Sequence, residues 1–458
     1  MKVVLLCGGI GKRMFPLTED KFLFKFLGKT LLQHQIENAK KMGFNDFVIV
    51  GNFLNIEKIK QICKGLNAKI EFVIQKEPNG MADALLSAEK KLRNDEILII
   101  NPNDVFDSAA YEKIINEYKK QKYDSYIIGY RVNTYFPGGY LVVNKKDELI
   151  KIHEKPGEGN EPSNMINIVI HLHKNTEKLL EELKNTKSER DDVYECTLSK
   201  IIKNGYKIKV VHYNGFWQAI KYPWDLFGTV KYFLDNISTQ KISSTAKISE
   251  NAKIYGNVVI EDNVNILENA VIRGPCYIGK NSIIGNNVLI WNYSHIGDNC
   301  VIGYSSEIKH SYIADNCWFH MSYVGDSIIS NNCAFGAGTI TANFRFDEKP
   351  IKVNIKGKKS ESGMDKLGVI MGENCKTGIN SCTMPGVRIG PNSIIGPGIT
   401  LHQDLEPNKI ILLKEKTYEI KENKITLSLE KRKELMKKLL VHGYNKENLF
   451  KSKLKTYD

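Results

Sequence analysis

The sequence lacks long apolar runs and closely paired cysteines. No stretch reaches the roughly 18 apolar residues of a membrane span, and the N-terminus passes from a short strand pattern into glycines without a signal-peptide cleavage region. The nine cysteines include no Cys-x-x-Cys pair, which indicates reduced, intracellular thiols. We therefore expect a cytoplasmic protein with no membrane partner.

The composition is ordinary for a soluble globular protein, apart from an excess of positive charge. At 458 residues the chain exceeds the size at which one core keeps growing, so we expect two or more domains. The net charge of +13 is compatible with nucleic acid, a membrane surface or an acidic small substrate. Because phosphate-binding motifs are present, we favour phosphorylated small molecules and expect no nucleic-acid partner.

An isoleucine repeat with a period of six residues fills part of the second half. Its members are Ile242, Ile248, Ile254, Ile260, Ile266, Ile272, Ile278, Ile284, Ile290, Ile296, Ile302 and Ile308. From Ala246 onward, a small or slender residue lies two positions before each isoleucine. This spacing is the hexapeptide signature of a parallel β-helix, in which each repeat stacks on the next coil. A β-sandwich with fortuitous spacing is the disfavoured alternative.

The repeat is lost after Ile308 and resumes later in the chain. Six-residue spacing returns at Met371, Thr377, Thr383, Ile389, Ile395 and Leu401. In between, a polar excursion reaches about Leu367, and such an excursion from a solenoid is where binding loops are expected. We predict domains at 1–235 and 236–405 and a C-terminal extension at 406–458. The extension should contain a short helix over 428–440.

Glycines follow the first predicted strand at once. Lys2 to Leu6 has the pattern of a buried strand, and Gly8, Gly9 and Gly11 come next. Such glycines let backbone N–H groups approach a phosphate. Strand and helix patterns then alternate over 47–50, 56–64, 70–74, 82–92 and 97–100. The alternation predicts a mainly parallel sheet with binding sites at the carboxyl ends of its strands.

This first half resembles the sugar-1-phosphate nucleotidyltransferases, whose opening motif has the form GGxGxR(L/M)xPLT…PK…KPLL. The matching residues are Gly8, Gly9, Gly11, Arg13, Pro16, Leu17, Thr18, Lys21 and Lys29. The resemblance implies an α/β nucleotide-binding (Rossmann-like) domain. In it the three glycines cradle a triphosphate, while Arg13 and Lys21 are catalytic. A generic dinucleotide fold is disfavoured, because its G-x-G-x-x-G spacing is absent.

The same resemblance assigns the base and the metal. It implies that Gln75 and the Gly80 backbone read a pyrimidine, and Met81 leaves UTP and dTTP both open. Asp104 would bind Mg²⁺, with an aspartate in a surface turn as the structural alternative. Relatives carry a second metal ligand at the position of Ala219. One carboxylate together with triphosphate oxygens can hold Mg²⁺, so an active and a silent nucleotidyl domain remain open.

Three further segments resemble those that hold the sugar in these enzymes. The resemblance implies that Gly139, Glu154 and Asn167 bind sugar hydroxyls and that Lys155 faces the sugar phosphate. Val169 replaces a glycine that is common just after the asparagine. We therefore expect a narrower sugar pocket.

Beyond Ile308, the segments H-x-x-Y and GAGTIT-x-N resemble the acetyltransferase half of the bifunctional GlmU enzymes and of archaeal two-domain relatives. The resemblance implies a left-handed parallel β-helix (hexapeptide repeat) domain that forms homotrimers and binds acetyl-CoA. His320 would be the general base for the sugar amine, since an imidazole titrates near neutrality. The other implied residues are Tyr323, Lys309, Lys349 and Lys352 for the sugar phosphate, Asn343 for the sugar or acetyl group, Ala337 for the oxyanion and Gly396 for the co-substrate.

We interpret the chain as a bifunctional enzyme of nucleotide-sugar synthesis, as in the formation of UDP-N-acetylglucosamine. Its predicted substrates are a sugar 1-phosphate, UTP or dTTP, and acetyl-CoA. Two alternatives stay open. One is an acetyltransferase with a silent nucleotidyl domain. The other is a non-catalytic regulator of the same plan, as in the guanine-exchange factor for translation initiation, and the presence of Arg13, Lys21, His320 and Tyr323 argues against it.

Overall fold

The apolar strands of the first half assemble into one sheet. The structure, a computed structural model, describes residues 1–9, 11, 13–190, 192–414, 422, 430 and 433. The strands of this sheet are β1 (Lys2–Leu6), β4 (Asp46–Gly51), β5 (Lys69–Ile74), β6 (Ile97–Ile100), β8 (Ser125–Arg131), β9 (Gly139–Val143), β10 (Leu149–Glu154), β11 (Met165–His173) and β12 (Ile208–Tyr213). Their order is β10-β9-β11-β6-β1-β4-β5, and β8 pairs with β11 and β12. The predicted parallel pairing holds for β6, β1, β4 and β5, whereas β8 to β11 pair with one another, and β11 with β6, in antiparallel fashion.

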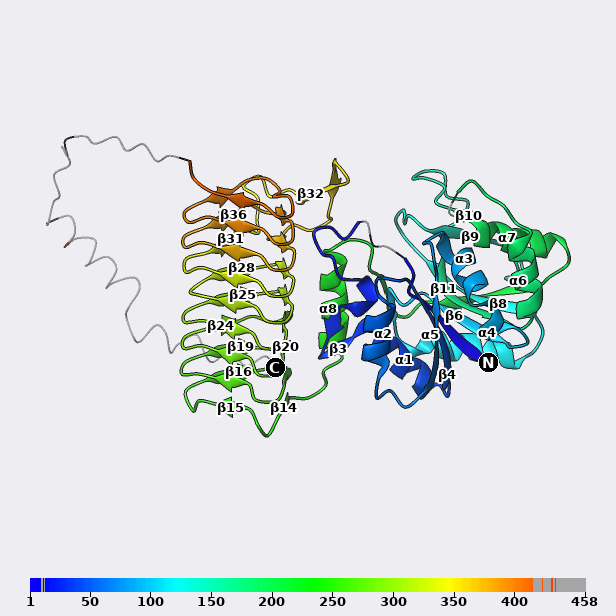
Figure 1. The fold of residues 1–458 in the computed structure, drawn as a ribbon, viewed down its shortest axis with the longest axis horizontal. Helices are drawn as coiled ribbons and strands as arrows, with labels where there is room; N and C mark the ends of the chain where they lie inside the picture. Colours follow the sequence, from blue (N-terminus) through cyan, green and yellow to red (C-terminus); the bar gives the residue numbers. More distant parts are fainter. Residues whose placement is uncertain are drawn as a thin grey trace, which may run out of the picture. The chain divides into compact units, whose positions relative to one another are not determined.

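Helices cover both faces of this sheet (Figure 1). One face carries α1 (Leu31–Lys41), α2 (Ile56–Cys63) and α5 (Ser108–Lys119); the other carries α3 (Gly80–Ser87), α4 (Glu89–Leu92), α6 (Thr176–Lys184) and α7 (Val193–Lys203). At the start of α1, Thr30 and Gln33 form a capping box that satisfies free N–H groups of the first turn. The single helix predicted over 82–92 is in fact two helices, since α3 ends before Ala88.

Short elements complete the first half and place its loops. They are the 3₁₀ helix η1 (Lys21–Leu23), the ribbon β2 (Lys25–Phe26) and β3 (Lys29–Thr30), the ribbon β7 (Asp104–Phe106) and β13 (Trp217–Ala219), and α8 (Asp225–Asp235). From β1 the chain moves to β4 and β5 on one side and then returns to β6 on the other side. A crevice for ligands is expected where the strand order reverses in this way, and the glycines after β1 lie there.

The second half is a parallel β-helix of three sheets. The first sheet contains β14 (Lys241–Ile242), β17 (Val258–Ile260), β20 (Cys276–Ile278), β23 (Ser294–Ile296), β26 (Tyr312–Ile313), β29 (Ile328–Ile329), β34 (Ile370–Met371) and β37 (Arg388–Ile389). The second contains β15 (Lys247–Ile248), β18 (Asn265–Ile266), β21 (Ile283–Ile284), β24 (Val301–Ile302), β27 (Trp318–Phe319), β30 (Ala334–Phe335), β35 (Lys376–Thr377), β38 (Ile394–Ile395) and β40 (Ile410–Ile411). The third contains β16 (Lys253–Tyr255), β19 (Val271–Arg273), β22 (Leu289–Ile290), β25 (Glu307–Lys309), β28 (Tyr323–Gly325), β31 (Ile340–Thr341), β36 (Cys382–Thr383) and β39 (Thr400–Leu401).

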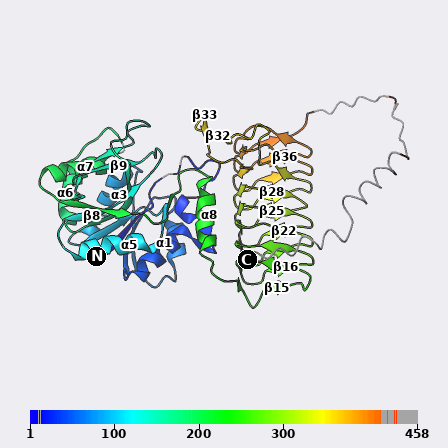
Figure 2. The same cartoon turned by 180° about the vertical axis from the view of Figure 1, so that it is seen from behind.

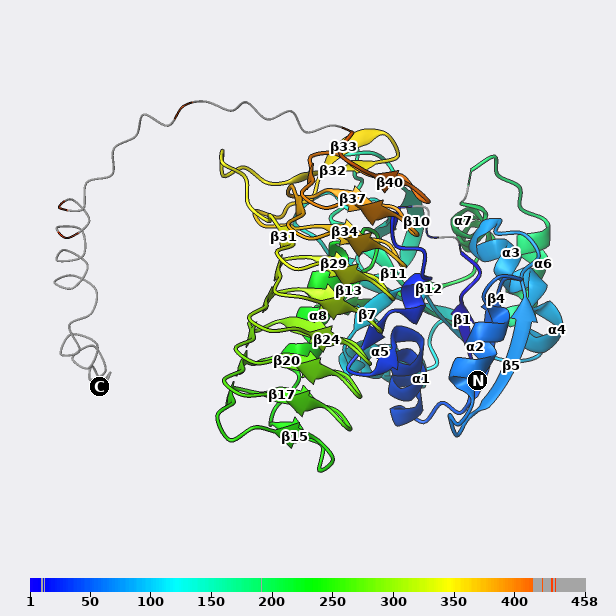
Figure 3. The same ribbon diagram turned by 60° about the vertical axis from the view of Figure 1, so that its left-hand side comes forward.

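The predicted isoleucines form the core of this coil. From Ile242 to Ile290, each pairs with the isoleucine three repeats later, as Ile260 does with Ile278, whereas Ile302 and Ile308 pair with Phe319 and Val324. From Ile260 to Ile308 all are buried. Figure 3 shows the rungs rising from β15 to β37. Ile242 and Ile248 belong to the first coil and are more exposed, because a first coil has no earlier coil beneath it. The predicted class, an α/β domain followed by a parallel β-helix, is confirmed.

The coil does not break after Ile308, although the six-residue spacing does. Strands β26 to β31 continue all three sheets, and several turns are one residue shorter. The inward positions are now Ile313, Phe319, Val324, Ile329, Phe335 and Thr341. Two aromatic rings, Phe319 and Phe335, meet edge to face at 4.8 Å where isoleucines stacked before. The expected loss of register is therefore a change of spacing within an intact coil.

The excursion predicted before Leu367 leaves the coil after β31. It contains the hairpin β32 (Lys352–Ile355) and β33 (Lys358–Glu361), which projects from the coil in Figure 2. At the C-terminal end of the coil, β40 lies beyond residue 405, the predicted end of the domain. The predicted helix over 428–440 lies outside the described residues.

The two halves share a hydrophobic core. Residues from α8, such as Leu226 and Val230, cluster with Phe26 of the first half and with Tyr312 of the coil. Met1–Leu413 accordingly form one compact unit. Within the described part of the chain, every helix is too short or too polar to span a bilayer.

Candidate functional site

A cavity of the first half opens at the carboxyl ends of β1, β5 and β6. It has a volume of about 590 Å³. The predicted residues that line it are Gly8, Gly9, Gly11, Arg13, Lys21, Gln75, Gly80, Glu154 and Lys155. Asp104, Gly139 and Asn167 are not among its lining residues. The structure thus brings together residues that are far apart in the sequence.

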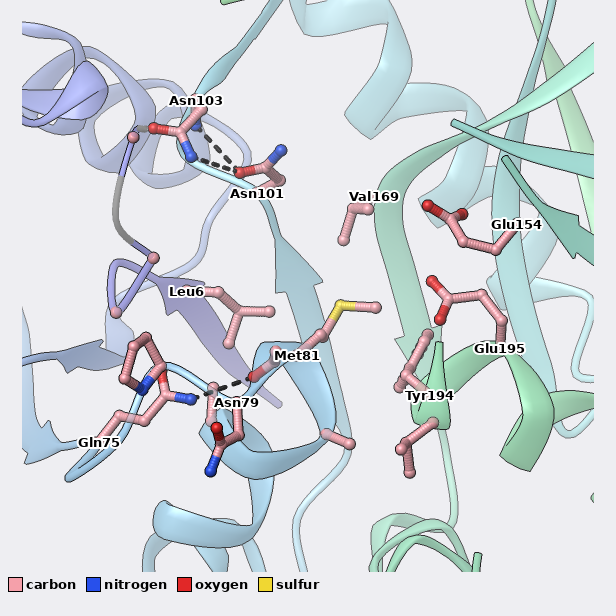
Figure 4. Close-up of a pocket in the computed structure, with 18 of the residues that line it drawn as sticks. Leu6, Gln75, Asn79, Met81, Asn101, Asn103, Glu154, Val169, Tyr194 and Glu195 are labelled. Carbon is pink, nitrogen blue, oxygen red and sulfur yellow. Dashed lines mark hydrogen bonds between the residues drawn. The ribbon is translucent and has the colours of Figure 1, made fainter. Parts of the chain in front are cut away.

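One side of the cavity is suited to a nucleobase. In Figure 4, Gln75 and Asn79 lie on one side, and Met81 extends toward the middle. The Gln75 amide nitrogen donates to the Gly80 carbonyl (3.1 Å) and to the Asp83 carboxylate (2.8 Å), so the orientation of the side chain is fixed. A Cβ on Gly8 would come within 2.0 Å of Gln75 Oε1. Gly8 is therefore required for the close packing of the loop on this glutamine.

The opposite side carries acidic groups that suit sugar hydroxyls. Glu154 and Glu195 lie there, with Val169 between this side and Met81 (Figure 4). Lys155 Nζ lies 2.8 Å from Glu154 Oε1, and Lys155 has a φ of +47°, which is uncommon for a residue with a side chain. Gly139 pairs with Glu154 across β9 and β10, which places it directly behind the sugar side.

Asn167 is positioned by a buried hydrogen-bond chain. Its Oδ1 atom can only accept, so His171 Nε2 donates to it (2.7 Å). His171 Nδ1 then accepts from the Tyr194 hydroxyl (2.7 Å), which in turn accepts from His173 Nε2 (2.8 Å). Burial lowers the pKa of His173 to about 3 and that of His171 well below its usual value, so both rings are neutral. The chain holds the Asn167 amide in one orientation beneath the sugar side.

The half-buried lysines beside the glycine loop lie near one buried carboxylate. Asp104 is 7% exposed and accepts from Trp217 Nε1 (3.1 Å) and Asn101 Nδ2 (3.0 Å). Burial raises the pKa of Asp104 to about 6, and Trp217, Lys221 and Lys21 partly offset this rise. Burial also lowers the pKa of Lys21 and brings that of Lys221 to about 8. Asp104 is thus not the aspartate of a surface turn.

The donor set fits Mg²⁺ only with help from a substrate. Ala219 pairs directly with Asp104 across β13 and β7, so the second ligand position offers no oxygen side chain. Among the described residues, no three His, Cys, Asp or Glu side chains form a ready metal cluster. Mg²⁺ prefers oxygen ligands and commonly takes one or two carboxylates together with substrate phosphates. Asp104 supplies one such carboxylate at the edge of the phosphate-binding loop.

The second predicted site lies on the third sheet of the coil. Asn343 Nδ2 donates to the Tyr323 hydroxyl (3.2 Å) and to Asp326 Oδ2 (2.6 Å). The other oxygen of Asp326 lies 3.5 Å from His310 Nδ1. His320 occupies the corner between β27 and β28, and its side chain is exposed. Tyr323 and the corner with His320 therefore belong to one coil of the β-helix, and Asn343 belongs to the next coil.

His320 lies between Gly303 and Gly336 in a column of corner residues. In successive coils, the N–H at this corner donates to a carbonyl of the next coil, and the residues in the column are Ser249, Leu267, Gly285, Gly303, His320, Gly336, Gly378 and Gly396. At Gly303 and Gly336, an added Cβ would lie within 3 Å of the backbone of the next coil. A side chain at these two glycines would require the next coil to shift, whereas Ser249, Leu267 and His320 show that other coils accept a side chain at this corner.

Comparisons with known proteins cover both halves. A family described as nucleotidyl transferase matches residues 2–240, and one described as bacterial transferase hexapeptide matches 257–290 and 275–310. A hexapeptide repeat of succinyl-transferase matches 368–403. A relative from Methanocaldococcus jannaschii, named bifunctional protein GlmU, is 40% identical over 418 residues, covering 90% of this chain and 97% of the relative.

A second relative, from Sulfurisphaera tokodaii, is named bifunctional sugar-1-phosphate nucleotidylyltransferase/acetyltransferase. It is 37% identical over 411 residues, covering 88% of this chain and 98% of the relative. The chain belongs to this bifunctional family. It is thus a nucleotidyltransferase and an acetyltransferase in one polypeptide, and the predicted pair of enzyme activities is confirmed.

Within this family plan, the basic residues of the acetyltransferase half fall into two groups. Lys309 Nζ and the Arg273 guanidinium both lie over the Trp291 ring, at 5.6 and 5.2 Å from its centroid. Lys349 and Lys352 lie on the excursion instead, where both side chains are exposed and Lys352 pairs with Glu361 (3.2 Å).

The two predicted co-substrate contacts lie in the second sheet's corners. Ala337 is half-buried, and its carbonyl accepts from the Asn380 N–H (2.8 Å). Gly396 is buried, and its N–H donates to the Ile411 carbonyl (2.8 Å). Ala337 follows β30 and Gly396 follows β38. Both strands belong to the second sheet, and β27 of the same sheet precedes His320.

Several cavity residues of the nucleotidyltransferase half were missed by the sequence analysis. They are Asn79, Asn101, Asn103, Tyr194, Glu195 and Lys356. Asn101 and Asn103 stand beside the predicted Asp104, so the strand-end rule could have found them. Glu195 lies in the first turn of α7, and Lys356 comes from the second half, so neither carries a local signal.

Proposed function

We propose that this chain acetylates an amino sugar 1-phosphate with acetyl-CoA and transfers a pyrimidine nucleotide from UTP or dTTP to a sugar 1-phosphate. The amino sugar is glucosamine- or galactosamine-1-phosphate. The observation that carries the proposal is the single cavity in which the glycine loop, Gln75 and Glu154 converge. It joins a phosphate-binding, a base-binding and a sugar-binding side at the switch point of the sheet.

In the nucleotidyl site, a sugar phosphate oxygen attacks the α-phosphate in line and displaces pyrophosphate. Gln75 holds the base, and Glu154 orients the sugar. Arg13 and Lys21 neutralise the charge that develops on the phosphates. Mg²⁺, held by Asp104 and the triphosphate, would add charge neutralisation and a template for the phosphates.

In the acetyltransferase site, the neutral sugar amine attacks the thioester carbonyl of acetyl-CoA. A C–N bond forms and the C–S bond breaks, so coenzyme A leaves as its thiolate. His320 takes the amine proton and delivers it to the leaving sulfur. Tyr323 and Asn343 hold the sugar, Lys309 faces its phosphate, and a backbone N–H near Ala337 steadies the oxyanion.

The acetyltransferase site is completed by a second copy of the chain in a homotrimer. The support is an exposed apolar strip around His320, formed by Tyr304, Trp318, Met321, Ile340 and Ile379, each at least 46% exposed. Exposed apolar patches of this kind mark interfaces in soluble proteins. The enzyme works in the cytoplasm, where all its substrates are soluble.

The test of this proposal is His320→Ala. We expect acetyl transfer to fall by about 10²- to 10⁴-fold, the usual contribution of a general base, while pyrophosphate release is unchanged. Each activity is measured with glucosamine- and galactosamine-1-phosphate, acetyl-CoA, UTP and dTTP. Loss of both activities would mean that the variant is misfolded. Full acetyl transfer by a folded variant would exclude His320 as the base.

A second candidate is an acetyltransferase whose nucleotidyl site is silent. The specific observation in its favour is Ala219, which removes an oxygen ligand opposite Asp104. In that case, wild-type enzyme would release no pyrophosphate with UTP or dTTP, whereas acetyl transfer would proceed.

A further inference from the structure

One lysine of the nucleotidyltransferase cavity comes from the acetyltransferase half. Lys356 lines the 590 Å³ cavity although it belongs to the hairpin β32–β33 of the excursion. It also lines an adjoining cavity of about 320 Å³, together with Arg13, Phe15 and Arg388. Arg13 is the other residue that both cavities share. Lys356 therefore reaches the nucleotidyl site on the side of Arg13.

The turn that carries Lys356 has a defined shape. Ile355 and Lys358 pair across the hairpin, so Lys356 and Gly357 form a two-residue loop. Their φ angles are +51° and +82°. Both positive angles are the mark of a type I′ turn, whose twist matches that of the flanking strands.

The base of the hairpin is anchored in the core shared by the two halves. Ile351 and Val353 are 1% and 0% exposed and belong to the same cluster as Met14 of the phosphate-binding loop. The Ser362 hydroxyl donates to the Ile351 carbonyl (2.6 Å), which closes the hairpin at its foot.

A second set of contacts ties the phosphate-binding loop to the coil. The Arg388 guanidinium lies over the Phe15 ring at 4.9 Å, and Asp404 pairs with Arg388 (2.8 Å). The Thr18 hydroxyl donates to Glu373 (3.2 Å). The loop and the hairpin are therefore held against the same end of the coil.

The charge and the location of Lys356 select its ligand. Gln75 and Gly80, on the base side, and Glu154 and Lys155, on the sugar side, do not line the adjoining cavity. The ammonium group of Lys356 thus serves the phosphate side, which already carries Arg13 and Lys21. An ammonium group binds phosphate oxygens through charge-assisted hydrogen bonds.

We propose that Lys356 binds the β- and γ-phosphates of the nucleoside triphosphate, and the pyrophosphate that leaves, so that the acetyltransferase half supplies part of the nucleotidyl site. This inference rests on the proposed nucleotidyl transfer. It also gives a physical reason for the fusion of the two halves. A separated nucleotidyl domain would lack this cation.

The experiment compares Lys356→Ala with Lys358→Ala in the full chain. Lys358 lies on the same hairpin and is exposed, but it lines neither cavity. Lys358→Ala therefore removes the same charge as Lys356→Ala without removing a cavity residue. For Lys356→Ala we expect the KM for UTP, and for pyrophosphate in the reverse reaction, to rise by about 10- to 100-fold. The KM for the sugar 1-phosphate should change less than about twofold, and Lys356→Arg should restore most of the affinity.

Acetyl transfer in each variant reports that the coil and its excursion are folded. Equal KM values for pyrophosphate in Lys356→Ala and Lys358→Ala would overturn the inference and leave the proposed function intact. If wild-type enzyme showed no turnover, calorimetric binding of UTP and of inorganic pyrophosphate would still decide. Weaker binding to Lys356→Ala alone supports the inference, and equal binding by both variants rejects it.

Discussion

Asp104 shows how one substitution changes the electrostatics of a site. A carboxylate opposite it would create two negative groups at a buried position, which only a cation could hold together. With Ala219 there instead, Asp104 stays near Lys21 and Lys221, and its pKa is raised to about 6 by burial. The two lysines thus provide part of the positive charge that a tightly held metal would otherwise supply.

Restoring the carboxylate should make the enzyme depend on Mg²⁺ for stability. Directly opposed residues have Cβ atoms about 5 Å apart, so the carboxylate of Ala219→Asp would repel Asp104 in the absence of metal. We expect the Tm of this variant to fall without Mg²⁺ and to rise with added Mg²⁺ more than the wild-type Tm does. Thermal unfolding with and without Mg²⁺ measures this effect directly.

The control for this variant is Ala219→Asn, which has nearly the same size and no charge. Its Tm should respond to Mg²⁺ as the wild-type Tm does. An equal response of the Asp and Asn variants would show that the two positions do not share a cation.

The residues of this site that the sequence could not predict have a common physical reason. Gln75 and Arg13 sit in local motifs beside strands, and a motif is visible in one dimension. Lys356 reaches the same cavity only because the excursion folds back, and Glu195 only because α7 begins at the cavity. Their positions depend on long-range packing, which no local spacing encodes.

Asparagines at the corners are the element that lets the coil turn. Their φ angles lie near +60°, as at Asn263, Asn281 and Asn299, a region that asparagine tolerates better than other side chains. The amides also join one coil to the next: Asn263 donates to Asn281 (3.2 Å), and Asn281 donates to Asn299 (3.1 Å). A corner asparagine therefore has two roles: its backbone adopts the positive φ angle of the corner, and its side-chain amide forms hydrogen bonds to the neighbouring coils.

Two substitutions at Asn281 separate these roles. Asn281→Gly keeps the positive φ and loses only the amide contacts, whereas Asn281→Ala loses both. We expect Ala to reduce the free energy of unfolding by about 1 kcal/mol more than Gly does, which is the cost of a left-handed alanine. Denaturant unfolding of the two variants measures the difference. Equal stabilities would show that the corner imposes no backbone strain.

The coil also shows what periodicity can and cannot predict. Twelve isoleucines at one spacing predicted the β-helix, because each repeat contributes the same inward position. From Ile313 to Thr341 the inward residues change type and the turns shorten, so the pattern fades although the hydrogen bonding continues. Regular spacing is visible in a sequence only where the repeats have the same length and residue type. The fold requires only that side chains fill the interior of each coil.

The two halves are joined by a polar and aromatic contact as well as by an apolar core. Lys25 of the first half pairs with Asp315 (2.6 Å) and Asp298 (3.4 Å) of the coil. Beside this pair, His295 stacks between Tyr277 (4.8 Å) and Tyr312 (5.0 Å) and lies near the Phe26 ring. Because the joint is shared, its titration should act on the whole molecule.

Burial of His295 should make the whole molecule less stable in mild acid. Burial lowers its pKa to about 4, against the weaker opposite effect of Asp315. An unfolded histidine titrates near 6.5, so between pH 6.5 and 4 the unfolded chain binds a proton that the folded chain does not. Stability therefore falls as the pH drops through this window, by about 2 kcal/mol at pH 5 for this one group.

His295→Phe keeps an aromatic ring in the stack and removes the titration. We expect the fall in Tm between pH 7 and pH 5 to shrink by about 2 °C in this variant, from the entropy of unfolding of a chain of this size. His402 is exposed, so His402→Gln should leave the wild-type pH dependence intact. If the Tm of His295→Phe and of His402→Gln falls on acidification by as much as the wild-type Tm does, protonation of His295 does not destabilise the folded chain. Other groups must then govern acid unfolding.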